Sequence, residues 1–221
     1  MKINHLFVCV LFISACQPST KKNSDISNSK NSESNSNFII SDKNFNLKDT
    51  TVLFLWRENI KDSSGHAYST LVVNEAYCKT IPEPIKAAIA FTATFIGNEC
   101  WWENDAPNED RTNLKCKILS VLDLGCQGSD THLKFLNSWF ASDKECLEKL
   151  NSIPTTPYTA TIQDTFDEIN VTVKGNIINV SFKARGMNIR EVREWEWKQT
   201  DSYAFSNNSL RVLKSNKTNL R

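Results

Sequence analysis

The residues of this chain that could do chemistry are few, and they form no recognised catalytic motif. Beyond residue 37 the sequence has two histidines, His66 in a polar stretch and His132 in the first turn of an expected helix. Neither lies beside a second histidine, a CxxC or an HExxH pattern, as zinc sites require, and no GxSxG motif or glycine-rich phosphate loop occurs. Cys146 and His132 would act as nucleophile and base only if the fold joined them; an unpaired structural cysteine and a surface histidine is the simpler interpretation. We therefore predict a non-enzymatic protein with no catalytic residue, metal or cofactor.

An acidic stretch, Glu103 to Asn113, is the first candidate for binding. Its carboxylates are oxygen ligands of the kind that Ca²⁺ prefers, but the spacing is not that of an EF-hand and the pivotal glycine is missing. We therefore expect a solvated acidic loop that contacts a cationic partner site. Two adjacent tryptophans border the loop, and neighbours on an extended chain cannot both point inward. The predicted partner-binding residues are Trp101, Trp102, Asp105, Glu109 and Asp110.

A second pair of tryptophans, Trp195 and Trp197, lies two residues apart in REWEWK. On a strand these two side chains share one face, and Glu194 and Glu196 share the other. A face with two tryptophans is either core or a platform for sugar rings or a protein partner, because the indole combines a large apolar area with a polar group. We expect core for at least one of them and keep carbohydrate binding by Trp195 and Trp197 as the alternative.

The start of the chain has the pattern of an export signal. Lys2 precedes a mostly apolar run of about eleven residues, Ile3 to Ile13, which is too short to span a bilayer as a helix and is typical of a signal peptide. The run ends in Ile13-Ser14-Ala15-Cys16, which resembles the lipobox of bacterial lipoproteins. That resemblance implies cleavage before Cys16, a diacylglycerol thioether on its sulfur and an acylated amino group. The alternative is an ordinary signal peptide cut near Ala15.

The residues that follow Cys16 indicate a location and a tether. In Gram-negative lipoproteins of this kind an Asp after the lipidated Cys is associated with inner-membrane retention. This chain has Gln17 there, so the resemblance implies the outer membrane. We expect the protein to face the periplasm, and exposure at the cell surface is the alternative. Ser and Asn fill twelve of the twenty-one positions from Gln17 to Asn37, a composition with too little apolar surface to fold. The expected organisation is a signal peptide (1–15), a lipidated Cys with a disordered tether (16–37), a single domain (38–214) and a frayed tail (215–221).

The charge of the chain argues against a nucleic-acid partner. Its 26 basic and 25 acidic residues give a net charge of +1. The two signs are interspersed, whereas nucleic-acid binding needs a basic stripe or patch. We expect a membrane contact through the lipid anchor only, and no nucleic acid.

The cysteines predict disulfides, because an exported protein folds in an oxidising compartment. Once Cys9 leaves with the signal peptide and Cys16 is lipidated, five cysteines remain. An odd number leaves at least one of them unpaired or bonded between chains. If the first two expected helices pack antiparallel, two pairs meet at opposite ends of the helical hairpin. The predicted disulfides are Cys100–Cys116 and Cys78–Cys126, with Cys146 left over.

Four helices are expected in the middle of the chain. Pro82 suits a helix start, and Gly97 and Gly125 have the position of glycines that end helices. Ser142 with Glu145 forms a capping box for the last helix. The helices are expected from about 82 to 96, from about 113 to 124, from Ser129 or Asp130 through Phe140, and from Ser142 to 153.

The pattern then changes to a period of two. Apolar and polar residues alternate on both sides of Gly175-Asn176, which is a two-residue hairpin signal. Further strand-like pieces are Val192 to Lys198, Ser202 to Phe205 and Leu210 to Leu213. The sequence therefore predicts an α+β fold: a disulfide-stapled helical segment (about 82–153), then an antiparallel β-meander (about 159–213), with an N-terminal strand near 51–56.

Together these features predict an envelope-anchored binding protein. Exported domains with disulfides, a tether and no catalytic motif include periplasmic inhibitors and immunity proteins, so the favoured partner is another protein of the cell envelope. This comparison is an analogy and matches no residues. The alternative is a carbohydrate-binding or peptidoglycan-binding accessory lipoprotein, and a structural or assembly role is a third interpretation.

Overall fold

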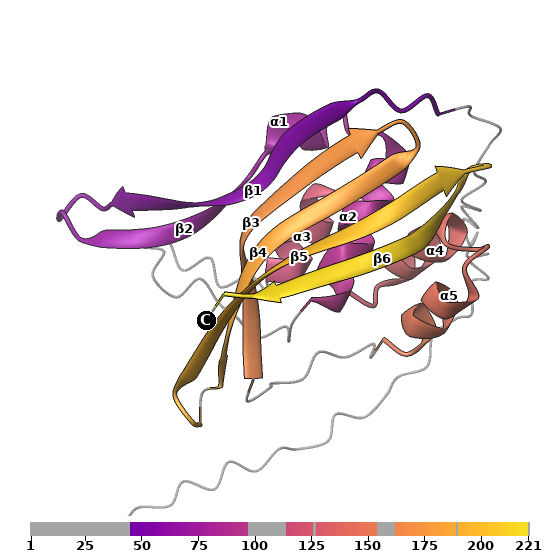
Figure 1. Ribbon diagram of the computed structural model, residues 1–221. Coiled ribbons are helices and arrows are strands. Elements are labelled where there is room, and N and C mark those ends of the chain that lie inside the picture. Colours follow the sequence, from indigo (N-terminus) through magenta and orange to yellow (C-terminus); the bar gives the residue numbers. More distant parts are fainter. Residues whose placement is uncertain (1–44, 97–113, 126, 154–161, 189, 221) are drawn as a thin grey trace, which may run out of the picture. The chain divides into compact units, whose positions relative to one another are not determined.

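The computed structural model describes residues 45–96, 114–125, 127–153, 162–188 and 190–220 (Figure 1). All of these residues belong to the second of the two units into which the chain divides, Asn37–Arg221. The elements are β1 (Thr50–Lys61), β2 (Ala67–Val73), α1 (Glu75–Cys78), α2 (Glu83–Phe95), α3 (Leu114–Val121), α4 (Asp130–Trp139), α5 (Lys144–Asn151), β3 (Ile162–Lys174), β4 (Ile177–Asn188), β5 (Arg193–Ser206) and β6 (Ser209–Asn219).

The strands form one six-stranded sheet in the order β2-β1-β3-β4-β5-β6, with every neighbouring pair antiparallel. The four strands after the helices are a meander, as predicted. The N-terminal strand joins this sheet beside β3, where Val52 lies opposite Val171. The α+β class and the N-terminal strand are therefore confirmed.

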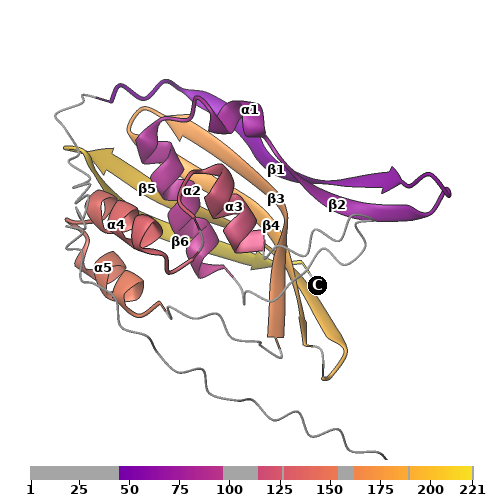
Figure 2. The same cartoon turned by 180° about the vertical axis from the view of Figure 1, so that it is seen from behind.

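Strand β4 shows why the sheet has two different faces. Val180, Phe182 and Ala184 are buried, whereas Ser181 and Lys183, which alternate with them, are partly exposed. Helices α2 to α5 pack on the apolar side of the sheet, as the view from behind shows (Figure 2). We call this side the covered face. The opposite side, to which Ser181 and Lys183 point, is the open face.

Helix α2 is the centre of the helical layer. It is apolar almost all the way round, with Ala87, Ala88, Ile89 and Ala90 fully buried, because the sheet lies on one side of it and α3 and α4 contact it as well. Burial of this kind is the main favourable contribution to folding. Phe91 joins α2 to the sheet through Tyr203 of β5, with ring centroids 6.1 Å apart.

The helix starts agree with the sequence in one case and differ in another. Ser129 caps α4 by accepting a hydrogen bond from the backbone N–H of His132, as predicted. The cap of α5 is Asp143, and the capping box expected from Ser142 is wrong. Asp143 accepts hydrogen bonds from the backbone N–H groups of both Cys146 and Val212. It therefore links α5 to β6 as well as capping the helix.

The last two strands are longer than predicted. β5 is one continuous strand where the sequence indicated two pieces, and the Asn207-Asn208 turn that follows it has φ of 49° and 55°. Two positive φ values are typical of a type I′ hairpin turn, and asparagine favours this conformation. β6 continues to Asn219, opposite Trp197, so residues 215–219 are strand where a frayed tail was expected. Their backbone pairing with β5 holds them although they have no apolar pattern.

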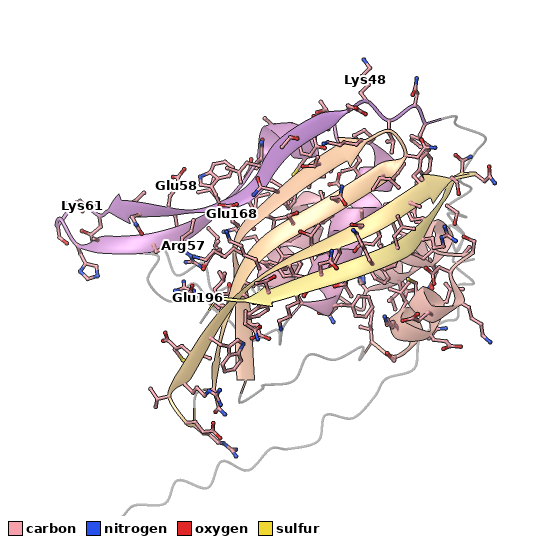
Figure 3. The ribbon with its side chains drawn as sticks, in the orientation of Figure 1. Lys48, Arg57, Glu58, Lys61, Glu168 and Glu196 are labelled. Carbon is pink, nitrogen blue, oxygen red and sulfur yellow. The ribbon has the colours of Figure 1, made fainter. Side chains whose placement is uncertain are left out.

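The sheet forks at β1 and β3. Pairing between these strands ends at Trp56 and Glu168, beyond which β1 pairs only with β2. Arg57 lies at the fork (Figure 3). Its guanidinium contacts Asp167, 2.9 Å away, and donates to the carbonyl of Phe166. Side-chain hydrogen bonds thus join the two strands where the backbone ladder stops.

The structure describes only some of the cysteines in the predicted disulfides. Cys78 and Cys146 carry free thiols, which agrees with Cys146 being left over. Cys78, predicted to bond Cys126, makes no disulfide within the described ranges. The predicted Cys78–Cys126 disulfide is therefore wrong, because the Cys78 thiol is free. Cys100 and the side chain of Cys116 lie outside the described residues, so the Cys100–Cys116 pairing stays a prediction.

Candidate binding surface on the open face of the sheet

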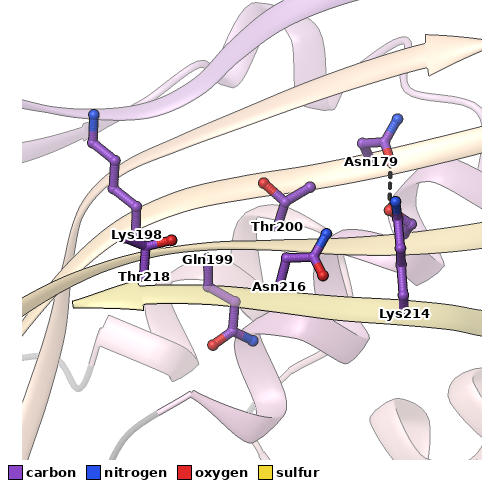
Figure 4. A pocket seen from close by; sticks show the side chains of 8 residues that line it. Asn179, Lys198, Gln199, Thr200, Lys214, Asn216 and Thr218 are labelled. Atoms are coloured by element: carbon purple, nitrogen blue, oxygen red, sulfur yellow. Dashed lines mark hydrogen bonds between the residues drawn. The ribbon is translucent and has the colours of Figure 1, made fainter.

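A shallow groove of about 300 Å³ lies on β4, β5 and β6 (Figure 4). Polar or basic residues line it, and none of them is apolar or aromatic; the side chain of one, Gln199, points to the covered side. Thr200 and Asn216 lie between Lys198 and Lys214 (Figure 4). The lining residues are Asn179, Lys198, Gln199, Thr200, Ser202, Lys214, Asn216 and Thr218.

The strand register places these side chains side by side. On the open face Thr200 of β5 lies opposite Ser181 of β4 and Asn216 of β6. Side chains on directly opposite residues of antiparallel strands are neighbours, so the alternating polar residues of three strands make one continuous surface.

A bulge in β6 decides where Lys214 points. The register shifts so that Tyr203 pairs with Val212 whereas Ser202 pairs with Lys214. Without the extra residue, Val212 and Lys214 would share a face, since side chains repeat with a period of two. The bulge allows Val212 to pack against the core and Lys214 to join the open face.

Hydrogen bonds between groove residues leave several side-chain donors unused. Ser202 Oγ donates to Asn179 Oδ1 at 2.7 Å, and the hydroxyls of Ser181 and Thr200 are 2.9 Å apart. The Asn179 amide nitrogen, the Asn216 side chain and the Thr218 hydroxyl make no hydrogen bond to other described residues. The groove therefore presents amide N–H groups and hydroxyls to an acceptor.

The two halves of the open face differ in their charges. In the half toward the fork, cations lie beside anions: Lys183 is 3.7 Å from Glu196 and Arg185 is 3.3 Å from Asp167. In the groove, no carboxylate of the described part of the chain lies within 4.0 Å of Lys198 or Lys214. Arg211, which lies opposite Ala204 on the open face, also has no acidic neighbour there. The groove half thus has an excess of positive charge.

A polar cluster also lies on the covered face, but its groups are engaged with one another. Asp201, 9 % exposed, accepts hydrogen bonds from Gln199 and Ser215 at 2.8 and 2.7 Å. The hydroxyls of Thr92 and Tyr203 are 2.6 Å apart. Burial raises the pKa of Tyr203 well above its ordinary value, and the nearby Asp201 charge adds to this. These are buried polar groups with partners, which is what a packed core requires.

The candidate nucleophile and base are each held in a structural role. His132 is 0 % exposed, so the expected surface position is wrong. Its Nε2 lies 2.9 Å from Thr94 Oγ1, and its Nδ1 accepts from the backbone N–H of Gly128 at 3.2 Å. Cys146 is 2 % exposed. Burial, together with a hydrogen bond to Asp143, raises the pKa of its thiol to about 12, so little thiolate forms at neutral pH.

The other predicted binding residues fall into two groups. Trp101, Trp102, Asp105, Glu109 and Asp110 lie outside the described residues, and partner binding by this loop stays a prediction. Trp195 and Trp197 share the covered side of β5, opposite Gly186 and Ala184 of β4. Trp197 is 5 % exposed, with Lys217 Nζ 4.5 Å from its ring centroid, and Trp195 is partly buried against the core.

Sequence reasoning missed Lys198, Thr200, Lys214 and Asn216. KQTDS and KSNKT are polar at every position, so the sequence does not separate the residues of the open face from those of the covered face. In the described ranges no three His, Cys, Asp or Glu side chains gather as a metal site needs. No helix of these ranges is long and apolar enough to cross a bilayer. No family model, curated protein or solved structure matches the chain.

Proposed function

We propose that this protein is a non-enzymatic binding protein, anchored in a bacterial envelope through lipid on Cys16, that recognises its partner with the open face of its sheet. The supporting observation is the groove on β4, β5 and β6, where, among the described residues, no helix covers the two lysines and no carboxylate lies within 4.0 Å of them. A sheet face needs no such cations for stability. Conformationally fixed strands also hold recognition groups more precisely than loops do.

The environments of the reactive side chains support a binding role over catalysis. A general base must reach its proton donor and a nucleophile needs a lowered pKa or an adjacent base. His132 has both ring nitrogens engaged by Thr94 and Gly128, and Cys146 has a raised pKa.

Blocking the open face tests the proposal. The full chain, purified in a non-ionic detergent, is mixed with envelope material of the bacterium that encodes it, and the bound fraction is measured after sedimentation. Thr200→Trp fills the groove at a strand position that tolerates an aromatic residue, and it should lower binding at least about tenfold. Thr131→Trp, on the exposed surface of α4, is the matched control. Equal binding by both variants would reject the open face as the recognition surface.

The anchor is tested separately. Cells expressing the full chain are given a labelled fatty acid, which Cys16 should incorporate. Cys16→Ser should abolish labelling and membrane attachment, whereas Cys78→Ser should change neither. Labelling that survives Cys16→Ser would remove the anchor from the proposal and leave the role of the open face unaffected.

A further inference from the structure

The positions of the groove cations limit what kind of anion fits between them. Lys198 lies opposite Thr218, and Lys214 is four residues before Thr218 on β6. At a rise of about 3.4 Å per residue, their backbones are roughly 14 Å apart along the strands. Two cations this far apart do not converge on one small anion. They fit a ligand that carries negative charge at more than one point along its length.

The surface between the lysines fits a ligand rich in oxygen acceptors. The unused groups there can all donate: the amide nitrogen of Asn179, the amide of Asn216 and the hydroxyl of Thr218, of which the last two can also accept. Hydrogen bonds from such donors to an ionised oxygen are stronger than those to a neutral one. Lysine binds carboxylate or phosphate as a point charge and does not demand a fixed planar geometry.

The residues absent from the groove lining exclude other ligand classes. The centres of protein–protein interfaces are enriched in aromatic residues and Met and depleted in Lys and Ser, whereas this lining has Lys198, Lys214 and Ser202 and no aromatic ring. No apolar side chain is present to receive an acyl chain. No indole or phenol is present on which a neutral sugar could stack.

From these observations we infer that the groove binds an acidic polysaccharide, a glycan chain that carries negatively charged groups. The inference rests on the proposed function, because it names the ligand of the same open face. Glycan hydroxyl, ring and carboxylate oxygens accept from the Asn and Thr donors, and the charged groups lie near Lys198 and Lys214. Arg211 extends the positive surface beyond Lys214.

A charged polymer and its neutral derivative test the inference. The full chain in non-ionic detergent is titrated calorimetrically with polygalacturonate, with fully methyl-esterified polygalacturonate and with poly-L-glutamate. Polygalacturonate should bind at least about tenfold more tightly than either of the other two, because it alone combines a glycan backbone with free carboxylates. Its affinity should fall as salt screens the charges.

Matched double variants place the charge effect in the groove. Lys198→Gln combined with Lys214→Gln should weaken polygalacturonate binding severalfold and by up to about 25-fold, since one exposed ion pair is worth up to roughly fivefold. Lys134→Gln combined with Lys144→Gln removes the same charge from exposed positions on α4 and α5 and should leave the affinity unchanged.

Each outcome supports or overturns a distinct statement. No binding of polygalacturonate, or equal binding of the methyl-esterified polymer, overturns the anionic ligand. Equal or tighter binding of poly-L-glutamate overturns the glycan in favour of an acidic peptide, and equal loss in the two double variants overturns the groove. The proposed function fails separately, if Thr200→Trp binds envelope material as well as the unchanged chain does.

Discussion

The two faces of this sheet are built from the same six strands, yet they contribute differently to the stability of the fold. On the covered face, Val180 and Phe182 pack against a helical layer and are at most 3 % exposed. On the open face their neighbours Asn179 and Ser181 are only half-buried and are bonded to hydroxyls of β5. Hydrophobic burial on one face provides the stability, so the other face is free to carry cations and donors that contribute little to folding.

Polar residues on the two faces also differ in how they are satisfied. The buried Asp201 has Gln199 and Ser215 as donors, because an unpartnered buried charge is very costly. Lys198 and Lys214 are exposed and water can solvate them, so they need no protein partner. Unpaired polar groups thus gather where folding does not require them to be paired, and these are the groups to which we assign recognition.

The largest contrast should appear between neighbours on β4. Phe182→Ala removes a ring 5.6 Å from that of Phe166 and should lower the free energy of unfolding by about 3–5 kcal/mol. Ser181→Ala loses one half-buried hydrogen bond and should cost about 1 kcal/mol or less. Denaturant unfolding of the full chain measures both changes in the free energy of unfolding. Similar losses would contradict the statement that the two faces differ in their contribution to stability.

Gly186 tests close packing on the covered face. A Cβ at this position would overlap the Asp164 carboxylate and the Trp195 indole, so Gly186→Ala should cost about 2 kcal/mol. If the overlap is the cause, Trp195→Ala should relieve part of this cost in a double-mutant cycle. Gly175→Ala is the control, because it has φ of +55° and open space. It should cost about 1 kcal/mol from backbone strain alone and show no coupling to Trp195.

Asp143 tests the link between α5 and β6. Asp143→Ala removes the cap and the acceptor for Val212 N–H and should cost about 1–2 kcal/mol at neutral pH. Burial alone would raise the pKa of Asp143, but hydrogen bonds from Cys146 and Val212 lower it overall. A lowered pKa contributes stability above the unfolded value near pH 4, and this is lost as pH falls through the folded value.

The difference between the unchanged chain and Asp143→Ala should therefore shrink below about pH 4, which unfolding curves from pH 7 to pH 3 would show. Ser142→Ala is the control, since the one side-chain hydrogen bond of Ser142 to a described residue is with the Ser209 hydroxyl. It should cost less than the loss of Asp143 and show no pH dependence. A larger effect from Ser142 would restore the capping box read from the sequence.

The smallest effect on stability should come from the groove itself. Lys198→Gln with Lys214→Gln changes two exposed side chains that have no acidic neighbour in the described residues, so the free energy of unfolding should change by no more than about 0.5 kcal/mol. The same denaturation assay measures it. A loss above about 2 kcal/mol would mean that these lysines stabilise the fold. It would contradict the statement that the open face is not needed for stability.

Local patterns predicted those parts of the fold whose partners are close in sequence. The alternation along β4, the Gly175-Asn176 turn and the Ser129 cap need only neighbouring residues. β5 was divided into two pieces because Gln199 and Asp201 interrupt its apolar side. In the folded chain Ser215 of β6 and Thr92 of α2 bond Asp201, and these partners are remote in sequence.

Even less of the candidate binding site could be predicted from the sequence. The sequence shows polar runs in β5 and β6, but not that the β6 bulge puts Lys214 on the opposite face from Val212. Nor does it show that Glu196, an acid of the open face, forms an ion pair with Lys183. No described carboxylate pairs with the groove lysines. Likewise, the polar first turn of its helix predicts that His132 is exposed. In the structure it is buried, because Thr94 of α2 lies against it.

The sequence by itself determined the α+β class, the meander, the N-terminal strand and the lipobox-like start, because periodicity, turn residues and short motifs act over a few positions. The tertiary contacts determine which face of the sheet the helices cover, which polar residues are buried and which cations have no carboxylate nearby among the described residues. Burial and charge pairing depend on elements that are distant along the chain and meet only when it folds.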